Sequence, residues 1–402
     1  MFHSAIGKGV SGMSEIKKKK QHFVPRFYLK LFADETHKFY VYDFRDRKII
    51  SNPVYYETQC YKNYFYGEDC IWENRLSEME GKWSGIINKV KNSEVLNEDD
   101  IISLKEFVLY QRQRTSAENN RSIEERLFFL RECAKTLYIN KGWLYDENAD
   151  RYCQERAKSD VTPAENLEMA TKMVDYIKDL NILIVCFDTD NDLITSDSPV
   201  ITLNPFLEFQ GFGYGNIGIV FLFPITPKHL LIVYDATLYT KYSNYIYVKS
   251  SDSAEVEIIN QYELIHAERM VFSTTIEKLY VDEQIIKHRS EEESRNKSQH
   301  LGPPGHRLII SHPSGVRYYY ELKYLLLHRD YRRIPYQCRE PIPRVQEEGW
   351  IHKLAIKYQV LSLAYKGSKE SRELSQSELK LGCRRMESQA KIYWANYKKR
   401  FG

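Results

Sequence analysis

Apolar residues recur along the chain with the periods of strands and helices. Residues 38–51, KFYVYDFRDRKIIS, alternate apolar with polar side chains on both sides of the polar turn RDRK, which predicts a β-hairpin. From Trp72 to Val90, apolar residues recur every three or four positions, the spacing of the buried stripe of a helix. Further helices are predicted at about residues 99–114, 122–139 and 163–178, the last with Thr162 as its N-cap and Pro163 at its first position.

Strand-like segments follow this helical region. Four apolar runs separated by turn residues predict strands, namely NILIVCFD, LITSDSPVIT, IGIVFLFPI and HLLIVYD, and a helix is predicted at about residues 254–270. The glycine-rich GFGYGNIG, residues 211–218, lacks the strand, spacing and helix of a nucleotide fingerprint and is interpreted as a hairpin loop. This order of elements predicts an α+β fold, with helices packed beside a mainly antiparallel sheet.

A change in composition near residue 287 predicts a domain boundary. Residues 287–306 are polar and contain Gly and Pro together, as linkers do. From Lys287 onward there are 24 Lys plus Arg against 12 Asp plus Glu, a net charge of +12, whereas the remainder has 34 against 43, a net charge of −9. We expect a flexible basic N-terminus at residues 1–19, an α+β domain at 20–286, a linker at 287–306 and a basic, tyrosine-rich region at 307–402.

Cysteine usage and hydropathy indicate a cytoplasmic protein. The seven cysteines are scattered and include no C-x-x-C pair, which fits a reducing compartment. The longest apolar runs are far shorter than the roughly 20 residues that cross a bilayer, so no membrane span is expected. The first 12 residues lack the order of a signal peptide, and we expect Met13 to be an alternative start of translation.

Several short motifs resemble a bacterial family known as domain of unknown function 4238. The resemblance covers about residues 20–280 and rests on the order of the motifs. These are HFVPRFYLKLF, VYDF, ENRLSEME, QRQRT, TSDSPV, FLFPITPKHLLIVYD and INQYELIHAERMVFS. The family name implies a bacterial protein and a shared domain, but no activity, and residues 287–402 fall outside the resemblance.

His22 is the first candidate for chemistry. It lies three residues before Pro25, and a proline holds the preceding residue extended, so His22 is expected on an entry strand or loop. Its imidazole could act as a general acid or base near pH 7. The structural alternative is a histidine hydrogen-bonded into the core.

The helical segments offer two carboxylates and a cation. Glu73 and Glu80 are seven residues apart, on one helix face, where they could share a metal ion, hold a basic side chain or form a solvated edge. Gln111 and Arg114 project together at the end of the next predicted helix. Arg114 could clamp a phosphate or carboxylate through two hydrogen bonds, or pair with one of those glutamates.

Asp197 lies between two serines and ahead of Pro199, where a predicted strand reaches a turn. Its carboxylate could accept hydrogen bonds from the backbone of the turn, or point into a cleft as a metal ligand or base. Both alternatives stay open from the sequence.

The basic tail mixes tyrosines with arginines. Phosphate neutralisation and aromatic stacking are typical of nucleic-acid binding, so Arg332, Arg333, Arg384 and Arg385 are candidate nucleic-acid-binding residues. The alternative is a basic surface that docks on the acidic first domain.

Two functional hypotheses follow. The first is a nuclease-like, metal-assisted phosphodiesterase in which His22, Glu73, Glu80, Gln111, Arg114 and Asp197 form the site and Mg²⁺ or Mn²⁺ is the cofactor. The second is a non-catalytic module that binds a protein or nucleic-acid partner. The motifs of zinc proteases, serine hydrolases and P-loop enzymes do not occur, which disfavours those classes.

Overall fold

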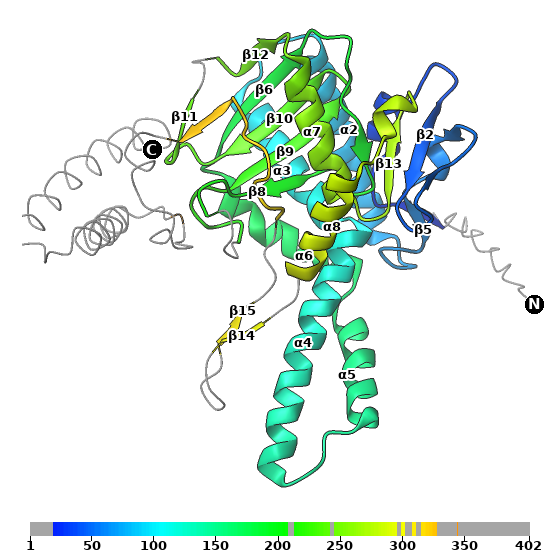
Figure 1. Cartoon of the computed structure of the whole chain (residues 1–402), viewed down its shortest axis with the longest axis vertical. Helices are drawn as coiled ribbons and strands as arrows, with labels where there is room; N and C mark the ends of the chain where they lie inside the picture. Colours follow the sequence, from blue (N-terminus) through cyan, green and yellow to red (C-terminus); the bar gives the residue numbers. More distant parts are fainter. Residues whose placement is uncertain are drawn as a thin grey trace, which may run out of the picture.

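The structure is a computed structural model, drawn as a cartoon in Figure 1. It describes residues 19–207, 213–241, 245–295, 299–301, 308–310, 315–327 and 344.

A five-stranded sheet in the order β12-β6-β10-β9-β8 forms the centre of the molecule. Neighbouring strands are antiparallel except β12 and β6, which are parallel. Every residue of β9 is buried, so both faces of the sheet are covered. The strands are β6 (Asn181–Phe187), β8 (Ile201–Leu203), β9 (Val220–Thr226), β10 (His229–Tyr234) and β12 (Tyr247–Ser250).

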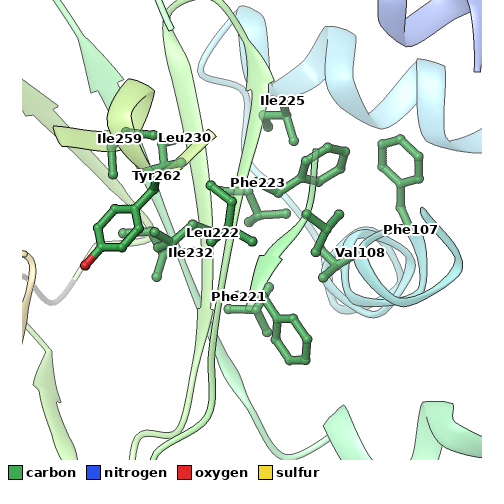
Figure 2. Close-up of a cluster of buried hydrophobic side chains, with 14 of the residues drawn as sticks. Phe107, Val108, Phe221, Leu222, Phe223, Ile225, Leu230, Ile232, Ile259 and Tyr262 are labelled. Carbon is green, nitrogen blue, oxygen red and sulfur yellow. The ribbon is translucent and has the colours of Figure 1, made fainter. Parts of the chain in front are cut away.

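Helices cover the two faces of this sheet. Figure 2 shows Phe221 and Phe223 pointing to one side, toward Phe107, whereas Leu222 points to the other side, toward Tyr262. The rings of Phe107 and Phe223 lie 5.1 Å apart, between centroids, in an edge-on arrangement. Alternate residues of β9 therefore pack against α3 (Glu98–Gln113) on one face and α7 (Ser253–His266) on the other.

A smaller sheet in the order β3-β2-β13-β7 lies beside the central one, and β4 also pairs with β2. The antiparallel pairing of β2 with β3 confirms the predicted hairpin at residues 38–51. The N-terminal strand β1 (Lys20–His22) pairs with β5 (Tyr61–Asn63). The other strands are β2 (Lys38–Asp43), β3 (Lys48–Ile49), β4 (Val54–Tyr55), β7 (Thr195–Ser196) and β13 (Met270–Ser273).

The predicted helices are confirmed, with shifted ends. The stripe from Trp72 to Val90 forms the buried face of α2 (Ile71–Lys91). The helix expected to continue to residue 178 is α6 (Pro163–Met173) followed by a 3-10 turn (Val174–Ile177), and Thr162 caps it as expected. The helix predicted to end at residue 270 stops at His266, because the chain then turns into β13. With its mainly antiparallel sheets, the chain has the α+β fold that the pattern predicts.

Two helices project from the body as a hairpin, which we call the arm (Figure 1). They are α4 (Ser116–Lys141) and α5 (Glu147–Asp160), and α5 is absent from the sequence prediction. Its buried face consists of Ala149, Cys153 and Ala157, small residues that allow the two helices to approach closely. Gly142 ends α4 in the left-handed conformation that glycine adopts without strain.

The segments after residue 280 that the structure describes remain in contact with this fold. Helix α8 (Glu283–Arg295) occupies the first part of the expected linker at residues 287–306. Further along, β16 (Leu325–Leu327) pairs with β11 (Tyr239–Lys241), and the backbone N–H of Val316 donates to the carbonyl of Thr202 at 2.8 Å. A short pair, β14 (Gln299–Leu301) and β15 (Leu308–Ile310), lies between them in the chain. The division into domains stays a prediction.

Candidate functional site

Arg114, at the C-terminal end of α3, joins the N-terminal strand to α2. Its guanidinium donates to the backbone carbonyl of His22 at 2.7 Å, to Glu80 Oε1 at 2.8 Å and to the hydroxyl of Tyr66 at 3.2 Å. The side chain is only 1% exposed. Burial opposes its charge, but Tyr66 and Glu80 outweigh burial and raise the pKa of Arg114. Of the two alternatives left open by the sequence, the structure has the ion pair with a glutamate.

The imidazole of His22 faces a different partner. Its Nε2 lies 3.1 Å from the carbonyl oxygen of Glu57, and its ring lies 5.3 Å from that of Tyr61, between centroids. Burial lowers the pKa of His22 to about 4, so the ring is neutral near pH 7 and Nε2–H can donate to the carbonyl. The structure brings His22 and Arg114 together through the backbone of His22.

Gln111 and Glu73 lie near this network. Gln111 is fully buried, and its Nε2 donates to the carbonyl of Phe23 at 3.2 Å. Glu73 lies two turns before Glu80 on α2. Burial is the main reason why the pKa of the Tyr66 hydroxyl is raised to about 12, and the charges of Glu80 and Glu73 add to this effect. These contacts tie the first strand to α2 and α3.

Asp197 lies in a separate environment, directly after β7. Its Oδ1 accepts from the backbone N–H of Glu268 at 3.0 Å, and its Oδ2 accepts from those of Arg269 and Met270 at 3.0 and 3.1 Å. Burial and the charge of Glu268 raise the pKa of Asp197 to about 7, although these three N–H groups favour the charged form. The carboxylate thus holds the turn between α7 and β13.

A polar group missed by the sequence analysis lies where the arm leaves the body. We call it the basal cluster; it comprises Arg112, Glu118, Arg121, Tyr214 and His266. Glu118 Oε2 lies 3.2 Å from Nη1 of Arg112 and accepts a 3.1 Å hydrogen bond from Nε of Arg121. Burial raises the pKa of Glu118, but the charges of Arg121 and Arg112 outweigh it and lower this pKa to about 2. One carboxylate therefore stays charged between two guanidinium groups.

The body closes the basal cluster from two sides. Gln113 Nε2 donates to the hydroxyl of Tyr214 at 3.1 Å. His266 Nδ1 lies 2.8 Å from the carbonyl oxygen of Ser198, and burial, aided by the charge of Arg112, lowers the pKa of His266 to about 3. The cluster thus connects α3, α4, α7 and the loop that carries Tyr214. The QRQRT motif contains a signal for the basal cluster, because Arg112 and Gln113 lie between Gln111 and Arg114, the two candidates taken from this motif.

The far end of the arm is apolar and open. Four side chains within eight residues, which we call the arm tip, are strongly exposed: Leu137 by 53%, Ile139 by 74%, Trp143 by 60% and Leu144 by 83%. Tyr138 lies against Trp143, because the two rings are 5.7 Å apart, between centroids, in an edge-on arrangement.

Polar contacts fix the two arm helices behind this tip. Asp150 on α5 accepts hydrogen bonds of 2.7 Å from Nε of Arg131 on α4 and 2.9 Å from the hydroxyl of Tyr145. These hydrogen bonds, with that from Gln154, lower the pKa of Asp150. An open hollow lies beside the tip, lined by Tyr145, Asp146, Glu147, Asp150, Arg151 and Gln154. The end of the arm therefore joins an apolar surface to a polar, mainly acidic one.

Two properties of the described residues bear on metal and membrane binding. Within the described ranges, no three His, Cys, Asp or Glu side chains gather closely enough to hold a metal ion. None of the helices in the same ranges has both the length and the apolar composition needed to span a bilayer. The candidate nucleic-acid-binding residues Arg332, Arg333, Arg384 and Arg385 lie outside the described residues.

Comparison with known proteins identifies one family. The model of the family described as "Protein of unknown function (DUF4238)" matches residues 20–275. This range includes the arm, Arg114 and Asp197. No curated protein and no solved structure matches the chain.

Proposed function

The chain belongs to the DUF4238 family of proteins of unknown function, and we propose that it is a non-catalytic module that binds a protein partner through the arm tip. The observation that carries this proposal is the exposure of Leu137, Ile139, Trp143 and Leu144 at the end of a projecting helix pair. Exposed apolar side chains forgo the free energy of burial, and a concentration of them at one end of a structure favours an interaction site.

The composition of the tip indicates how a partner would be held. Tryptophan is enriched among the residues that contribute most to protein interfaces, especially where neighbouring apolar groups exclude water around it. Trp143 has Leu144 beside it in the chain and rests against Tyr138. Trp143 would therefore be the central anchor in an apolar pocket of the partner. The carboxylates of the adjoining hollow suit basic groups at the rim of that pocket.

The basal cluster supports the proposal because it fixes the direction of the arm. A binding surface that is held in place before the partner arrives loses less conformational freedom on binding. Glu118 joins the first turn of α4 to Arg112 of α3 by a buried ion pair, so the base of the arm is tied to the body.

The five described cysteines are free thiols, which supports a reducing, cytoplasmic setting for the interaction.

The nuclease-like hydrolase stays a prediction and ranks second. Its proposed cation, Arg114, is paired with Glu80, and its proposed base or ligand, Asp197, accepts from three backbone N–H groups. These engagements favour structural roles for the same residues. Incubation of the purified protein with oligonucleotides and Mg²⁺ or Mn²⁺ measures the alternative directly.

The binding proposal is tested by quantitative affinity capture with cross-linking from the source cells. The wild-type chain is compared with a tip variant, Trp143→Ala with Leu144→Glu, and with a control variant, Tyr280→Ala with Val95→Glu, which alters exposed side chains of the body. At least one protein should be captured equally by the wild type and the control, and roughly tenfold less by the tip variant, as expected for an interface anchor. Equal capture by all three would overturn the proposal, as would metal-dependent cleavage that the tip variant retains and Arg114→Ala loses.

A further inference from the structure

Arg344 is buried against the body although it lies far beyond the segment that matches the family. Its side chain is 4% exposed. Its Nε donates to Asp179 Oδ2 at 2.9 Å, and its Nη1 donates to the carbonyls of Tyr214 and Asn216 at 2.8 and 2.9 Å. Its Nη2 donates to the carbonyl of Tyr176 and to Asp179 Oδ1. These partners surround the whole guanidinium group.

The set of acceptors matches a guanidinium in number and direction. A guanidinium has five N–H groups in one plane, and each of the five in Arg344 has an acceptor. An ammonium has three N–H groups arranged as a compact point charge, so a lysine cannot satisfy this set. The backbone N–H of Arg344 also donates to the carbonyl of Gly215 at 2.5 Å. The backbone of Arg344 is thus bound as well as its side chain.

Charge adds to this match. Asp179 is mostly buried and contacts the guanidinium with both carboxylate oxygens. A second buried carboxylate, Asp235, lies within the field of Arg344: burial raises the pKa of Asp235, and the charge of Arg344 is the largest influence that opposes burial. Without this cation, two carboxylates would remain in a poorly hydrated place, which is costly.

Two separate chain segments carry the groups that surround the guanidinium of Arg344. Tyr176 and Asp179 come from the turn before β6, and Tyr214, Gly215 and Asn216 come from the loop before β9. These two segments are in contact, because a Cβ atom at Gly215 would lie 3.4 Å from the Tyr176 ring. The carbonyl of Tyr214 faces Arg344, while its hydroxyl accepts from Gln113 beside the basal cluster.

We propose that these groups form a guanidinium-binding pocket whose ligand is Arg344 of the same chain, so that an arginine side chain fastens the region after the family domain onto that domain. The proposal is independent of the partner-binding function. It assigns a role to the loop at residues 213–216, which the sequence analysis interpreted only as part of a hairpin connection.

The test is chemical rescue of Arg344→Ala, which removes the ligand and leaves the pocket. Backbone hydrogen exchange at residues 213–218 should become about tenfold faster. The loop carbonyls lose their hydrogen bonds to Arg344, so the loop opens more often and exposes its N–H groups to water. Titration with ethylguanidinium should restore the slow exchange and raise the melting temperature, because a ligand that binds only the folded state stabilises it. Ethylammonium, which has the same charge but lacks the planar fork, should not.

The controls decide between recognition and general stabilisation. Arg45→Ala removes an exposed arginine elsewhere in the chain. In this variant, hydrogen exchange at residues 213–218 should match that of the wild type, both with and without ethylguanidinium. Unaltered exchange in Arg344→Ala, or equal rescue by both ions, would overturn the proposal. If Arg344→Ala does not fold, Asp179→Asn replaces it: this substitution removes the charge and one acceptor, and it should also accelerate exchange in the loop. Wild-type exchange in Asp179→Asn would equally overturn the proposal.

Discussion

The buried carboxylate of Glu118 accepts a 3.1 Å hydrogen bond from Nε of Arg121, one turn further along α4. A pair at this spacing on an exposed helix contributes little, since water screens it. Here Glu118 is 1% exposed and also pairs with Arg112 of the preceding helix. The carboxylate of Glu118 therefore connects the arm to the body through Arg112, in addition to its pairing with Arg121 within α4.

Glu118→Ala should destabilise the protein strongly. The substitution leaves two guanidinium groups without their shared carboxylate, and breaking a buried pair costs about 3–5 kcal/mol. Denaturant unfolding measures the loss. Glu125→Ala, at a partly exposed position that also pairs with Arg121, should cost about 1 kcal/mol or less. Equal losses for the two variants would show that the buried position of Glu118 has no special role.

His22 should make stability depend on pH. The pKa of its ring falls from 6.5 in the unfolded chain to about 4 in the folded one, so the folded state binds fewer protons between these values. Its contribution is therefore complete above pH 6.5 and is lost as the pH falls toward 4, with a slope of up to about 1.4 kcal/mol per pH unit.

Replacing His22 with Gln tests this linkage, because glutamine can donate to the carbonyl of Glu57 and does not titrate. The variant should show a shallower dependence of unfolding free energy on pH between 4 and 6.5 than the wild type. Identical slopes would mean that the imidazole is equally protonated in the folded and unfolded chains.

Asp197→Asn should loosen the turn between α7 and β13. The amide nitrogen cannot accept a hydrogen bond, so at least one part-buried backbone N–H among residues 268–270 loses its partner, at a cost of about 1 kcal/mol. Hydrogen exchange at those three amides should accelerate in parallel. Full stability combined with loss of a measured activity would instead favour the catalytic hypothesis.

The tail hypothesis predicts a salt dependence. If the basic region binds nucleic acid, each neutralised phosphate releases counterions, and affinity falls steeply as salt rises. Reversing Arg332, Arg333, Arg384 and Arg385 to Glu should then weaken oligonucleotide binding by orders of magnitude without unfolding the family domain. A wild-type chain that does not bind oligonucleotides at low salt would remove nucleic acid from the candidate partners.

The accuracy of the sequence predictions follows the strength of the periodic signal. Helix α2 is predictable because large apolar residues mark its buried face at every turn, from Trp72 to Val90. Helix α5 is not, because its buried face contains only Ala149, Cys153 and Ala157 among charged residues. Small side chains that allow close helix packing carry almost no hydrophobic signal.

The residues at the sites were harder to assign than the elements. Near its end α3 is buried on all sides, so no periodicity distinguishes the face of Arg114 from that of Arg112. The partner of Arg114 includes the backbone carbonyl of His22, 92 residues earlier in the chain, which leaves no trace in the side-chain pattern. The partners of Arg344 likewise depend on which chain segments the fold brings together.

The junction between the body and the arm is only two residues long. Arg114 is the C-cap of α3, and the next residue, Thr115, caps α4 through its side chain. A helix of 26 residues is about 39 Å long at 1.5 Å per residue, and its direction is set at this joint. On the proposed function, the arm is a spacer of fixed length that holds a bound partner at a distance from the central sheet. Lengthening α4 and α5 together by whole turns would move the end of the arm outward without altering the tip or the base.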